Sequence, residues 1–263
     1  MAMSPATGSA ATTIHTSAEG LNEGMFELPV ADGTMAAYCA RPAQGSGFPV
    51  VLVVQEIFGL HDHIRDVCRR FAHEGYMAVS AELYQRQGDA AAYTDIPKLV
   101  QDIVSRVPDE QVMSDLDACV SWAGANGGDV SRVGVTGFCW GGRITWLYAA
   151  HNARCRAGVA WYGRLVQGHG ALQVRHPVDV AGELHAPVLG LYGELDAGIP
   201  LDGVERMRQG LARGNQASQA SEIIVYPGAD HAFYADYRPS YHPQAAVDAW
   251  QRTVAWFARH LKA

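Results

Sequence analysis

The sequence predicts an α/β fold with a mostly parallel central sheet, helices on both of its faces and an antiparallel start. Short apolar runs that are rich in β-branched residues alternate along the chain with longer segments whose apolar residues follow helical spacing. No internal repeat interrupts this alternation. The 263 residues, 48% of them apolar and 18% charged, are enough for one large domain with a substantial core.

The first 20 residues carry no strand or helix signal. Met1 to Ser17 is rich in alanine, serine and threonine, and the first basic residue of the chain is Arg41. A secretory signal would need a basic start and an apolar segment, and a transit peptide would need arginines. We therefore expect residues 1–20 to form a flexible leader and residues 21–263 to form a single domain.

The domain begins with a predicted hairpin of Met25–Val30 and Thr34–Ala40, joined at Asp32-Gly33. The run Pro49–Val54 is short and rich in valine, which is typical of a strand covered on both faces. His61–His73 follows with apolar residues at helical spacing and predicts the first helix. This succession of strand and helix starts the parallel part of the sheet.

The rest of the chain repeats the alternation. A capping-box pattern that begins at Ser114 predicts the start of a helix. Arg132–Thr136 predicts a strand that continues through a glycine-flanked cysteine into a helix over Gly141–Ala150. The clearest helix starts near Pro243 and places apolar residues three or four apart as far as Leu261. Four further apolar runs predict strands: Tyr76–Ala81, Ala157–Trp161, Val188–Tyr192 and Glu222–Tyr226.

The composition excludes several kinds of partner. The net charge is −7 and the lysines are Lys98 and Lys262 alone, so we expect neither nucleic acid nor a membrane surface as a partner. The five cysteines are odd in number and lack C-x-x-C spacing, which favours a reducing, cytoplasmic location over a disulfide framework. His61 and His63 have no third ligand at useful spacing, so no metal and no cofactor are expected.

The segment Gly137-Phe-Cys139-Trp-Gly141 follows a predicted strand and precedes a predicted helix. The nucleophile-elbow motif requires this context, because its strained turn brings the flanking positions so close together that they must be glycine. The N–H groups at the start of the following helix favour a thiolate over a thiol. Cys139 is therefore a candidate nucleophile. On this motif alone, a small buried structural cysteine is the alternative.

An elbow enzyme carries its acid, and then its histidine, later in the chain. Asp196 and His231 each follow a predicted strand, so both lie at the carboxyl edge of the sheet, where ligand sites of open parallel sheets gather. Glu194 and Asp230 compete for the role of the acid. Asp196 fits the spacing better, and its short side chain suits a loop that must reach an imidazole.

Four separated motifs occur together in this chain. They are Gly-Phe-Cys-Trp-Gly-Gly at 137–142, Gln-Glu-Ile-Phe-Gly at 55–59, Leu-Tyr-Gln-Arg at 83–86 and Asp-His-Ala-Phe at 230–233. Together they resemble the dienelactone hydrolases, also called carboxymethylenebutenolidases, from about Met25 to the C-terminus. The resemblance implies the α/β-hydrolase fold. It also implies that an enol lactone or ester is opened through a triad of Cys139, His231 and Asp196 and a thioester acyl-enzyme.

The resemblance implies roles for further residues. Glu56 would pair with the thiol in the resting enzyme and would be displaced when substrate arrives. The backbone N–H groups of Ile57 and Trp140 would form the oxyanion hole. Arg86 would bind the carboxylate of a lactone substrate, for which a planar guanidinium is well suited.

Aromatic side chains predict the walls of the substrate pocket, with Trp140 and Tyr162 foremost. The positions directly after His231 lack a second arginine, and Arg238 lies further along the chain. The predicted substrate-binding residues are Arg86, Tyr162, Tyr84 and Phe233.

Three functions stay open at this point. The first is a dienelactone-type hydrolase. The second, favoured by the absent second arginine, is a broad-specificity carboxylesterase or thioesterase on the same triad. The third is a non-catalytic binding or redox-responsive protein with a reactive Cys139. The predicted partner is a small-molecule ester or lactone, which can carry a carboxylate, and the sequence leaves the oligomeric state open.

Overall fold

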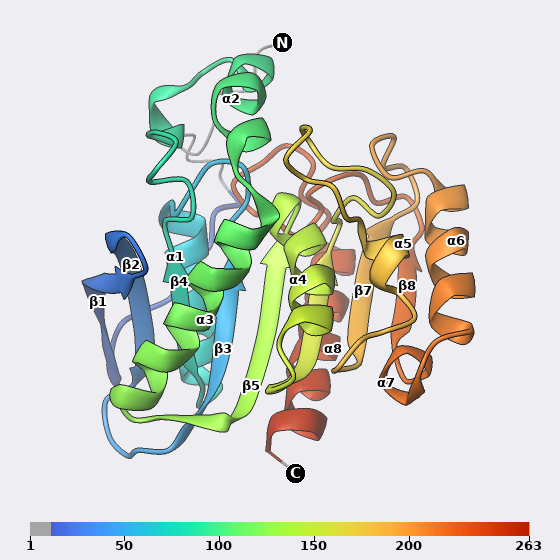
Figure 1. Cartoon of the computed structure of the whole chain (residues 1–263). Helices are drawn as coiled ribbons and strands as arrows, with labels where there is room; N and C mark the ends of the chain where they lie inside the picture. Colours follow the sequence, from blue (N-terminus) through green and yellow to red (C-terminus); the bar gives the residue numbers. More distant parts are fainter. Residues whose placement is uncertain (1–11, 263) are drawn as a thin grey trace.

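A computed structural model describes residues 12–262 of the chain. Its centre is one eight-stranded sheet with the order β1-β2-β4-β3-β5-β6-β7-β8, shown in Figure 1. Strands β3 to β8 are parallel, whereas β1 and β2 are antiparallel to each other and β2 is antiparallel to β4. The strands are β1 (Leu21–Val30), β2 (Gly33–Pro42), β3 (Phe48–Val54), β4 (Met77–Ala81), β5 (Gly128–Phe138), β6 (Cys155–Trp161), β7 (Val188–Gly193) and β8 (Glu222–Tyr226).

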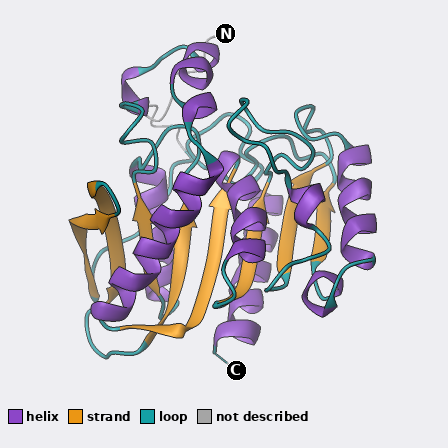
Figure 2. Ribbon diagram, in the orientation of Figure 1, coloured by secondary structure: helices purple, strands orange, loops and turns teal. Residues whose placement is uncertain are grey.

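Helices cover both faces of this sheet (Figure 2). In the view of Figure 1, α3 and α4 lie in front of the strands, and α1 and α8 lie behind them. The α-helices are α1 (Asp62–His73), α2 (Ile96–Asp102), α3 (Asp109–Ala125), α4 (Trp140–His151), α5 (Pro177–Val180), α6 (Leu201–Ala212), α7 (Gln216–Gln219) and α8 (Pro243–Leu261). Two short 3₁₀ turns, Ala90–Ala92 and Val104–Arg106, flank α2. The predicted α/β class, with its antiparallel start, is confirmed.

The core lies between the sheet and its helices. Every residue of β3, β4 and β7 is buried, as the short valine-rich runs predicted for strands covered on both faces. Because these strands are parallel, their carboxyl ends and the loops that follow them meet along one edge of the sheet, at the top in Figure 1. The fold thereby gathers polar loop residues from distant parts of the sequence at one edge.

The start of α3 differs from the prediction. The helix begins at Asp109, so that Ser114 lies inside it and caps nothing. Pro108 precedes the helix in an extended conformation, and Asp109 and Glu110 place acidic side chains in its first turn, next to the positive end of the helix dipole. These signals outweigh the capping-box pattern. Helices α2 and α6 were not predicted.

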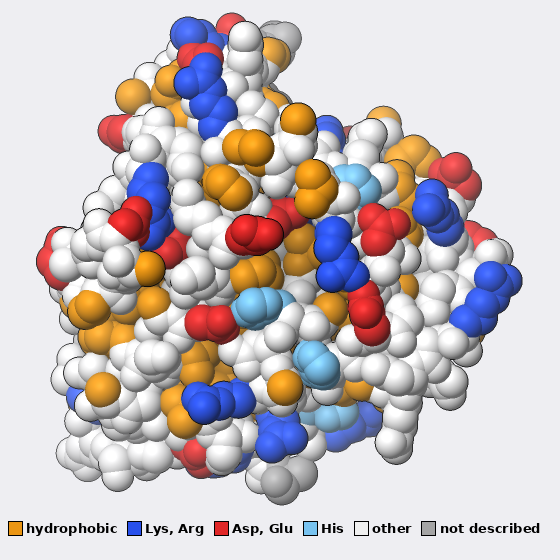
Figure 3. Space-filling view, viewed as in Figure 1, with side chains coloured by type: hydrophobic (Ala, Val, Ile, Leu, Met, Phe, Trp, Pro, Cys, Tyr) orange, Lys and Arg blue, Asp and Glu red, His pale blue; other side chains and the backbone are white. Residues whose placement is uncertain are grey.

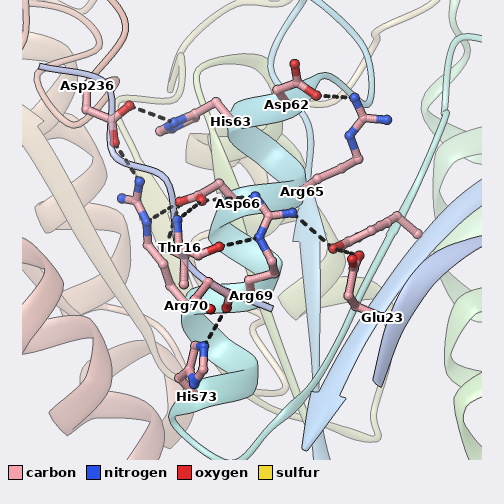
Figure 4. Close-up of polar contacts among 12 residues, drawn as sticks. Thr16, Glu23, Asp62, His63, Arg65, Asp66, Arg69, Arg70, His73 and Asp236 are labelled. Carbon is pink, nitrogen blue, oxygen red and sulfur yellow. Dashed lines mark hydrogen bonds and ion pairs between the residues drawn. The ribbon is translucent and has the colours of Figure 1, made fainter. Parts of the chain in front are cut away.

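The N-terminal segment that precedes β1 packs against α1. The N–H of Thr16 donates to Asp66 Oδ1 at 2.6 Å, and Arg69 Nε donates to the carbonyl of Thr16 at 2.9 Å (Figure 4). Thr12 also hydrogen-bonds to the carbonyl oxygen of Asp236. The expectation of a detached leader therefore does not hold for Thr12 to Ser17, and residues 1–11 of the predicted leader lie outside the described residues.

Charged side chains on the face seen in Figure 3 occur as small separate groups in which acidic and basic residues are interspersed. This face carries no broad basic area of the kind that a nucleic-acid backbone requires. Among residues 12–262, no helix combines the length and the apolar composition needed to cross a membrane.

Candidate active site

Cys139 lies at the sharp turn between β5 and α4. Its backbone has φ 55° and ψ −112°, a conformation that L-residues rarely adopt. The glycines of the motif permit this turn, because a Cβ on Gly137 would lie 2.3 Å from the carbonyl oxygen of Gly141. A Cβ on Gly141 would lie 2.5 Å from the carbonyl oxygens of Val54 and Gln55. The predicted elbow geometry is therefore present, with the thiol at the start of α4.

His231 and Asp196 approach Cys139 from the loops after β8 and β7. Nε2 of His231 lies 3.2 Å from Sγ of Cys139, and Nδ1 of the same ring lies 2.7 Å from Oδ2 of Asp196. Asp196 is buried, whereas about a third of the His231 side chain is exposed, at 32%. The structure thus brings the three predicted triad residues together in the predicted order of contacts.

The competing acids of the sequence have other partners. Glu194 accepts a hydrogen bond from the N–H of Gly228, at 2.9 Å from Oε2. Asp230 accepts one from the backbone N–H of His231, at 2.6 Å from Oδ1. Neither carboxylate is bonded to the imidazole, and of the three acids only Asp196 orients that ring.

Two electrostatic effects act on His231 in opposite directions. Burial alone would lower the pKa of its imidazole, because it disfavours the charged form. The negative charge at Cys139 and the hydrogen bond to Asp196 outweigh burial and raise the pKa of His231 to about 10. His231 is therefore placed to hold a proton next to the sulfur of Cys139.

Backbone strain is concentrated around this site. Among residues 12–262, the non-glycine residues with positive φ are Cys139, Tyr162 at 37° and Ala232 at 61°. Tyr162 follows β6 and Ala232 follows His231, so each flanks the cysteine–histidine pair. Such conformations cost free energy and occur mainly where the surrounding structure fixes a functional geometry.

A pocket of about 480 Å³ opens onto Cys139, His231 and Asp196. Its polar wall includes Arg164, His169 and Arg238. Burial lowers the pKa of His169 to about 4, so its ring is neutral at neutral pH. The apolar wall includes Ile57, Ile96, Val100, Tyr162 and Ile199.

The two predicted oxyanion donors belong to the loop after β3 and to the start of α4. Ile57 lies three residues after the end of β3 and lines the pocket together with Cys139. Trp140 is the first residue of α4, so its N–H has no acceptor within the helix. The two residues come from different elements, and their backbone N–H groups remain the predicted oxyanion donors.

The loop that carries Glu56 and Ile57 is braced by the segment after β4. Oε1 of Gln55 accepts the N–H of Leu83 at 3.1 Å, and Oε2 of Glu82 accepts the N–H of Leu60 at 2.7 Å. The two motifs at 55–59 and 83–86 are therefore in direct contact. Their joint presence in the sequence reflects one connected structure, which includes Ile57 of the pocket wall.

Glu56 does not pair with the thiol in this structure. Its side chain is fully buried, and its Oε2 accepts a hydrogen bond from the hydroxyl of Tyr237 at 2.6 Å. Nε2 of His61 lies 3.3 Å from the same oxygen. The sulfur of Cys139 faces His231 instead. The expected resting-state contact between Glu56 and Cys139 is thus absent from this conformation.

The structure places Arg86 away from the pocket, which corrects its predicted role. The guanidinium binds Asp115 through Nη1 at 2.8 Å and Nη2 at 3.1 Å, and it also binds Asp32 through Nε at 2.7 Å. These two carboxylates use the donors that were expected to hold a substrate. Arg86 instead ties the turn of the β1–β2 hairpin to α3.

The predicted aromatic residues divide into pocket and core. Tyr162 lines the pocket and lies edge-on to His231, with ring centroids 5.3 Å apart. Tyr84 is buried against the ring of Trp140, and Phe233 is buried against Tyr162. Trp140, Tyr84 and Phe233 are therefore not among the residues that line the pocket, and Phe233 packs behind the ring of Tyr162.

Three pocket residues were not predicted: Arg164, His169 and Arg238. Arg164 comes three residues after the end of β6, so the rule that sites gather at carboxyl ends of strands could have indicated it. Arg238 was set aside because it lies seven positions after His231. Turns between them, such as the bond from the N–H of Arg238 to the carbonyl of Ala235 at 2.8 Å, fold the loop back toward the pocket.

Among residues 12–262, no group of three or more histidine, cysteine, aspartate or glutamate side chains is arranged to hold a metal ion. The imidazole rings of His61 and His63 are stacked with centroids 6.1 Å apart. They face different carboxylates, those of Glu56 and Asp236.

Relatives that share one name match nearly the whole length of this chain. A curated relative from Methylorubrum extorquens, provisionally named carboxymethylenebutenolidase, is 55% identical over 252 residues, which are 95% of this chain and 86% of the relative. A relative of the same name from Escherichia coli strain K12 is 54% identical over 252 residues, covering 95% of this chain and 92% of the relative.

A solved structure and a family model agree with these relatives. The crystal structure of a Klebsiella pneumoniae protein, provisionally described as a dienelactone hydrolase, has 56% sequence identity and a TM-score of 0.88, and it covers 91% of this chain and 99% of that one. The model of the dienelactone hydrolase family matches residues 35–261. The chain belongs to the dienelactone hydrolase family and has the α/β-hydrolase fold.

Proposed function

We propose that this protein hydrolyses a small-molecule ester or lactone through a thioester formed on Cys139. The observation that carries the proposal is the pair of contacts at His231, 3.2 Å to the sulfur of Cys139 and 2.7 Å to the carboxylate of Asp196. A nucleophile, a base and an orienting acid in this geometry are the requirements of acyl transfer.

The first half of the reaction forms the thioester. Nε2 of His231 holds the proton of the Cys139 thiol, and the sulfur attacks the carbonyl carbon of the substrate. The carbonyl oxygen gains negative charge, which the N–H groups of Ile57 and Trp140 stabilise. Each such donor contributes roughly 10²- to 10³-fold in rate. The bond from the carbonyl carbon to the ester oxygen then breaks, and His231 gives its proton to that oxygen.

The second half releases the acid. His231 takes a proton from a water molecule, whose oxygen attacks the thioester carbon. The carbon–sulfur bond breaks, and Cys139 returns to its starting state. An enol lactone suits this sequence, because its leaving oxygen is a stabilised enolate and a thiolate can expel it. An unactivated alkyl ester would react more slowly.

The pocket supports a substrate that carries a negative charge. Arg164 and Arg238 line the same pocket as Cys139, and a guanidinium binds a carboxylate through two parallel hydrogen bonds. The neutral ring of His169 adds a further hydrogen-bonding group to this wall. These side chains would take over the role that Arg86 cannot fill.

A broad-specificity carboxylesterase or thioesterase is the second candidate. Two observations favour it: Arg86 is bound to Asp32 and Asp115, and the apolar Ile96, Val100 and Ile199 line the pocket. Such a wall would accept uncharged acyl groups of varied shape.

The test is a comparison of kcat/KM for a carboxylated enol lactone and for a neutral aryl acetate, with Cys139→Ala as the blank and Cys119→Ala as a matched control at a buried cysteine. A strong preference for the lactone that disappears in Cys139→Ala supports the first candidate. Comparable kcat/KM values for the two substrates, both lost in Cys139→Ala, support the second candidate. Activity that survives in Cys139→Ala, or the absence of activity toward both substrates, would refute the proposal.

A further inference from the structure

The N-terminal segment Thr12–Ser17, which we call the strap, connects α1 with the loop that follows β8. Both carboxylate oxygens of Asp66 in α1 accept hydrogen bonds from Thr16, at 2.6 Å from its backbone N–H and 3.0 Å from its hydroxyl (Figure 4). At the other end of the strap, the hydroxyl of Thr12 donates to the carbonyl oxygen of Asp236 in the loop after β8. The strap therefore contacts two elements that are far apart in the sequence.

Arg70 of α1 binds the carboxylates of the same two acids. Its Nε donates to Oδ2 of Asp66 at 2.7 Å, and its Nη2 donates to Oδ2 of Asp236 at 2.6 Å, as Figure 4 shows. Its Nη1 donates to the hydroxyl of Tyr234 at 2.9 Å. Each of the three guanidinium nitrogens therefore has an acceptor, and two of these acceptors belong to the loop after β8.

This bridge between α1 and the loop is shielded from solvent. The side chain of Arg70 is 11% exposed, that of Asp66 is 4% exposed and that of Asp236 is 1% exposed. Burial alone would raise the pKa of Asp236, but His63 and Arg70 lower it, so the carboxylate is ionised at neutral pH. Hydrogen bonds between buried charged groups are strong, and the loss of one leaves a desolvated charge without a partner. The bridge therefore fixes the loop firmly to α1.

The same loop carries Arg238 to the pocket. The N–H of Arg238 donates to the carbonyl oxygen of Ala235 at 2.8 Å, and Asp236 lies inside the turn that this bond closes. The guanidinium of Arg238 lies over the ring of Phe58, 5.6 Å from its centroid, and lines the pocket together with Cys139. Because no ion pair among residues 12–262 involves Arg238, its place in the pocket depends on the turn that carries it.

We propose that Arg70 is a positioning residue that, together with the strap, fixes the turn at Asp236 and so holds Arg238 in the pocket, where Arg238 selects anionic substrates. This inference rests on the proposed function, because Arg238 would act on the substrate of the same pocket. Neither α1 nor the strap lines that pocket, so both would influence substrate binding only through the loop.

Amide hydrogen exchange of the substrate-free protein, followed by mass spectrometry, tests the hold on the loop. The peptides to compare cover residues 232–242, in which three N–H groups are hydrogen-bonded within the loop, those of Ala235, Arg238 and His242. In Arg70→Met they should exchange about tenfold faster or more, the effect of one lost hydrogen bond to a charged group on local opening. Peptides from β3 are the internal reference. Unchanged exchange of the loop would overturn the proposal.

Two further variants separate this effect from general damage to the fold. Arg132→Met is the matched control, because Arg132 also bonds an aspartate, Asp129 at 2.7 Å from Nε, but lies near the start of β5. It should leave exchange of the loop unchanged. Thr12→Val removes only the strap's hydrogen bond to Asp236 and should accelerate the same peptides by a smaller factor. Circular dichroism checks folding, and Thr12→Val decides if Arg70→Met does not fold.

A double-mutant cycle in the kinetics tests whether Arg70 acts through Arg238. Arg70→Met should raise KM for a carboxylated enol lactone by up to about tenfold, the limit set by the loss of Arg238 itself, and should leave KM for a neutral aryl acetate nearly unchanged. In Arg70→Met/Arg238→Ala, KM for the lactone should equal that of Arg238→Ala alone. A merely structural role for Arg70 would lower stability without this selectivity. Unchanged KM for the lactone, equal changes for both substrates, or multiplied effects in the double variant would show the proposal to be wrong.

The outcome is separate from that of the proposed function. Hydrogen exchange needs neither substrate nor turnover, so loop exchange that depends on Arg70 in a protein without hydrolysis would refute the proposed function alone. Conversely, hydrolysis that depends on Cys139, together with loop exchange that is insensitive to Arg70 and Thr12, would refute the positioning role alone.

Discussion

Two regions of the molecule use arginine in opposite ways: the β1–β2 side of the sheet, called the hairpin end, and the pocket at the carboxyl ends of the central strands, called the pocket end. At the hairpin end, Arg86 is bound by two carboxylates, Asp32 and Asp115, and it joins β1–β2 to α3. At the pocket end, Arg238 lines the cavity, and its guanidinium lies over the ring of Phe58, 5.6 Å from the ring centroid. None of the ion pairs found among residues 12–262 involves Arg238.

This difference shows that a sequence motif alone does not determine whether an arginine is available to bind a ligand. Arg86 stands in a motif that implies substrate binding, yet two acids from other segments use its donors first. Arg238 stands outside every motif, yet the folded loop brings it to the pocket. An arginine is available to a ligand only if no carboxylate of the chain already satisfies it. The hairpin end should therefore control stability, and the pocket end should control activity.

The largest expected effect is at the pocket end. Cys139→Ala should reduce kcat by about 10⁴-fold or more, because the nucleophile of a triad cannot be replaced by the binding groups that remain. The melting temperature should change little, since the thiol is partly exposed and the substitution removes a single heavy atom, the sulfur. Steady-state kinetics and thermal melting on the same sample give both numbers. A large loss of stability would make Cys139 a structural residue.

The second effect concerns the charge state of His231. NMR titration of its imidazole should give a pKa near 10 in the wild type, because Cys139 and Asp196 outweigh burial. The folded-state pKa is raised, so this contribution to stability is complete below about pH 6.5, the ordinary histidine value. It is lost as the pH rises through about 10. In Cys139→Ala the pKa should fall markedly, and an unchanged titration would contradict the pairing.

At the hairpin end, Arg86→Ala should lower the free energy of unfolding by about 2 to 3 kcal/mol. The substitution leaves the buried Asp115 without its partner, and the effect is below that for a fully buried pair because Arg86 is 23% exposed. Asp32→Asn, at the exposed partner, should shift urea unfolding far less. Both variants should keep kcat/KM. A selective loss of activity toward carboxylated substrates in Arg86→Ala would restore its predicted role.

The smallest expected effect separates the substrates. Arg238→Ala should raise KM for a carboxylated lactone by about tenfold, the effect of one lost charged hydrogen bond, and should leave KM for a neutral aryl acetate nearly unchanged. Arg206→Ala, on α6, is the matched control for loss of a positive charge. Equal changes for both substrates would mean that Arg238 shapes the pocket and does not recognise charge.

The fold and the chemical centre could be predicted from local patterns. Short runs rich in valine predict strands such as β3. The elbow at Cys139 is indicated by its flanking glycines, where an added Cβ would collide with the backbone. Chain order then indicated Asp196 and His231, because parallel strands carry their following loops to one edge. Each of these inferences depends on neighbours in sequence or on the direction of a strand.

The environment of the site depends on long-range pairing, which these patterns do not encode. That Asp115 in α3 reaches Arg86, or that Tyr237 reaches Glu56, follows only from how the loops pack in three dimensions. The start of α3 was missed because a capping-box pattern recurs inside a helix whose true start is set by Pro108. The sequence therefore predicted the positions of Cys139, Asp196 and His231 better than the contacts that surround the site.

In the proposed reaction, hydrolysis passes through a thioester on Cys139. The most direct test is rapid quenching of the wild type with an aryl acetate, followed by mass spectrometry of the peptide that carries Cys139. We expect an acetyl adduct on this cysteine that forms with a burst of the phenolic product and is absent from Cys139→Ala. Turnover by the wild type with no adduct on Cys139, or with the adduct on another residue, would contradict it.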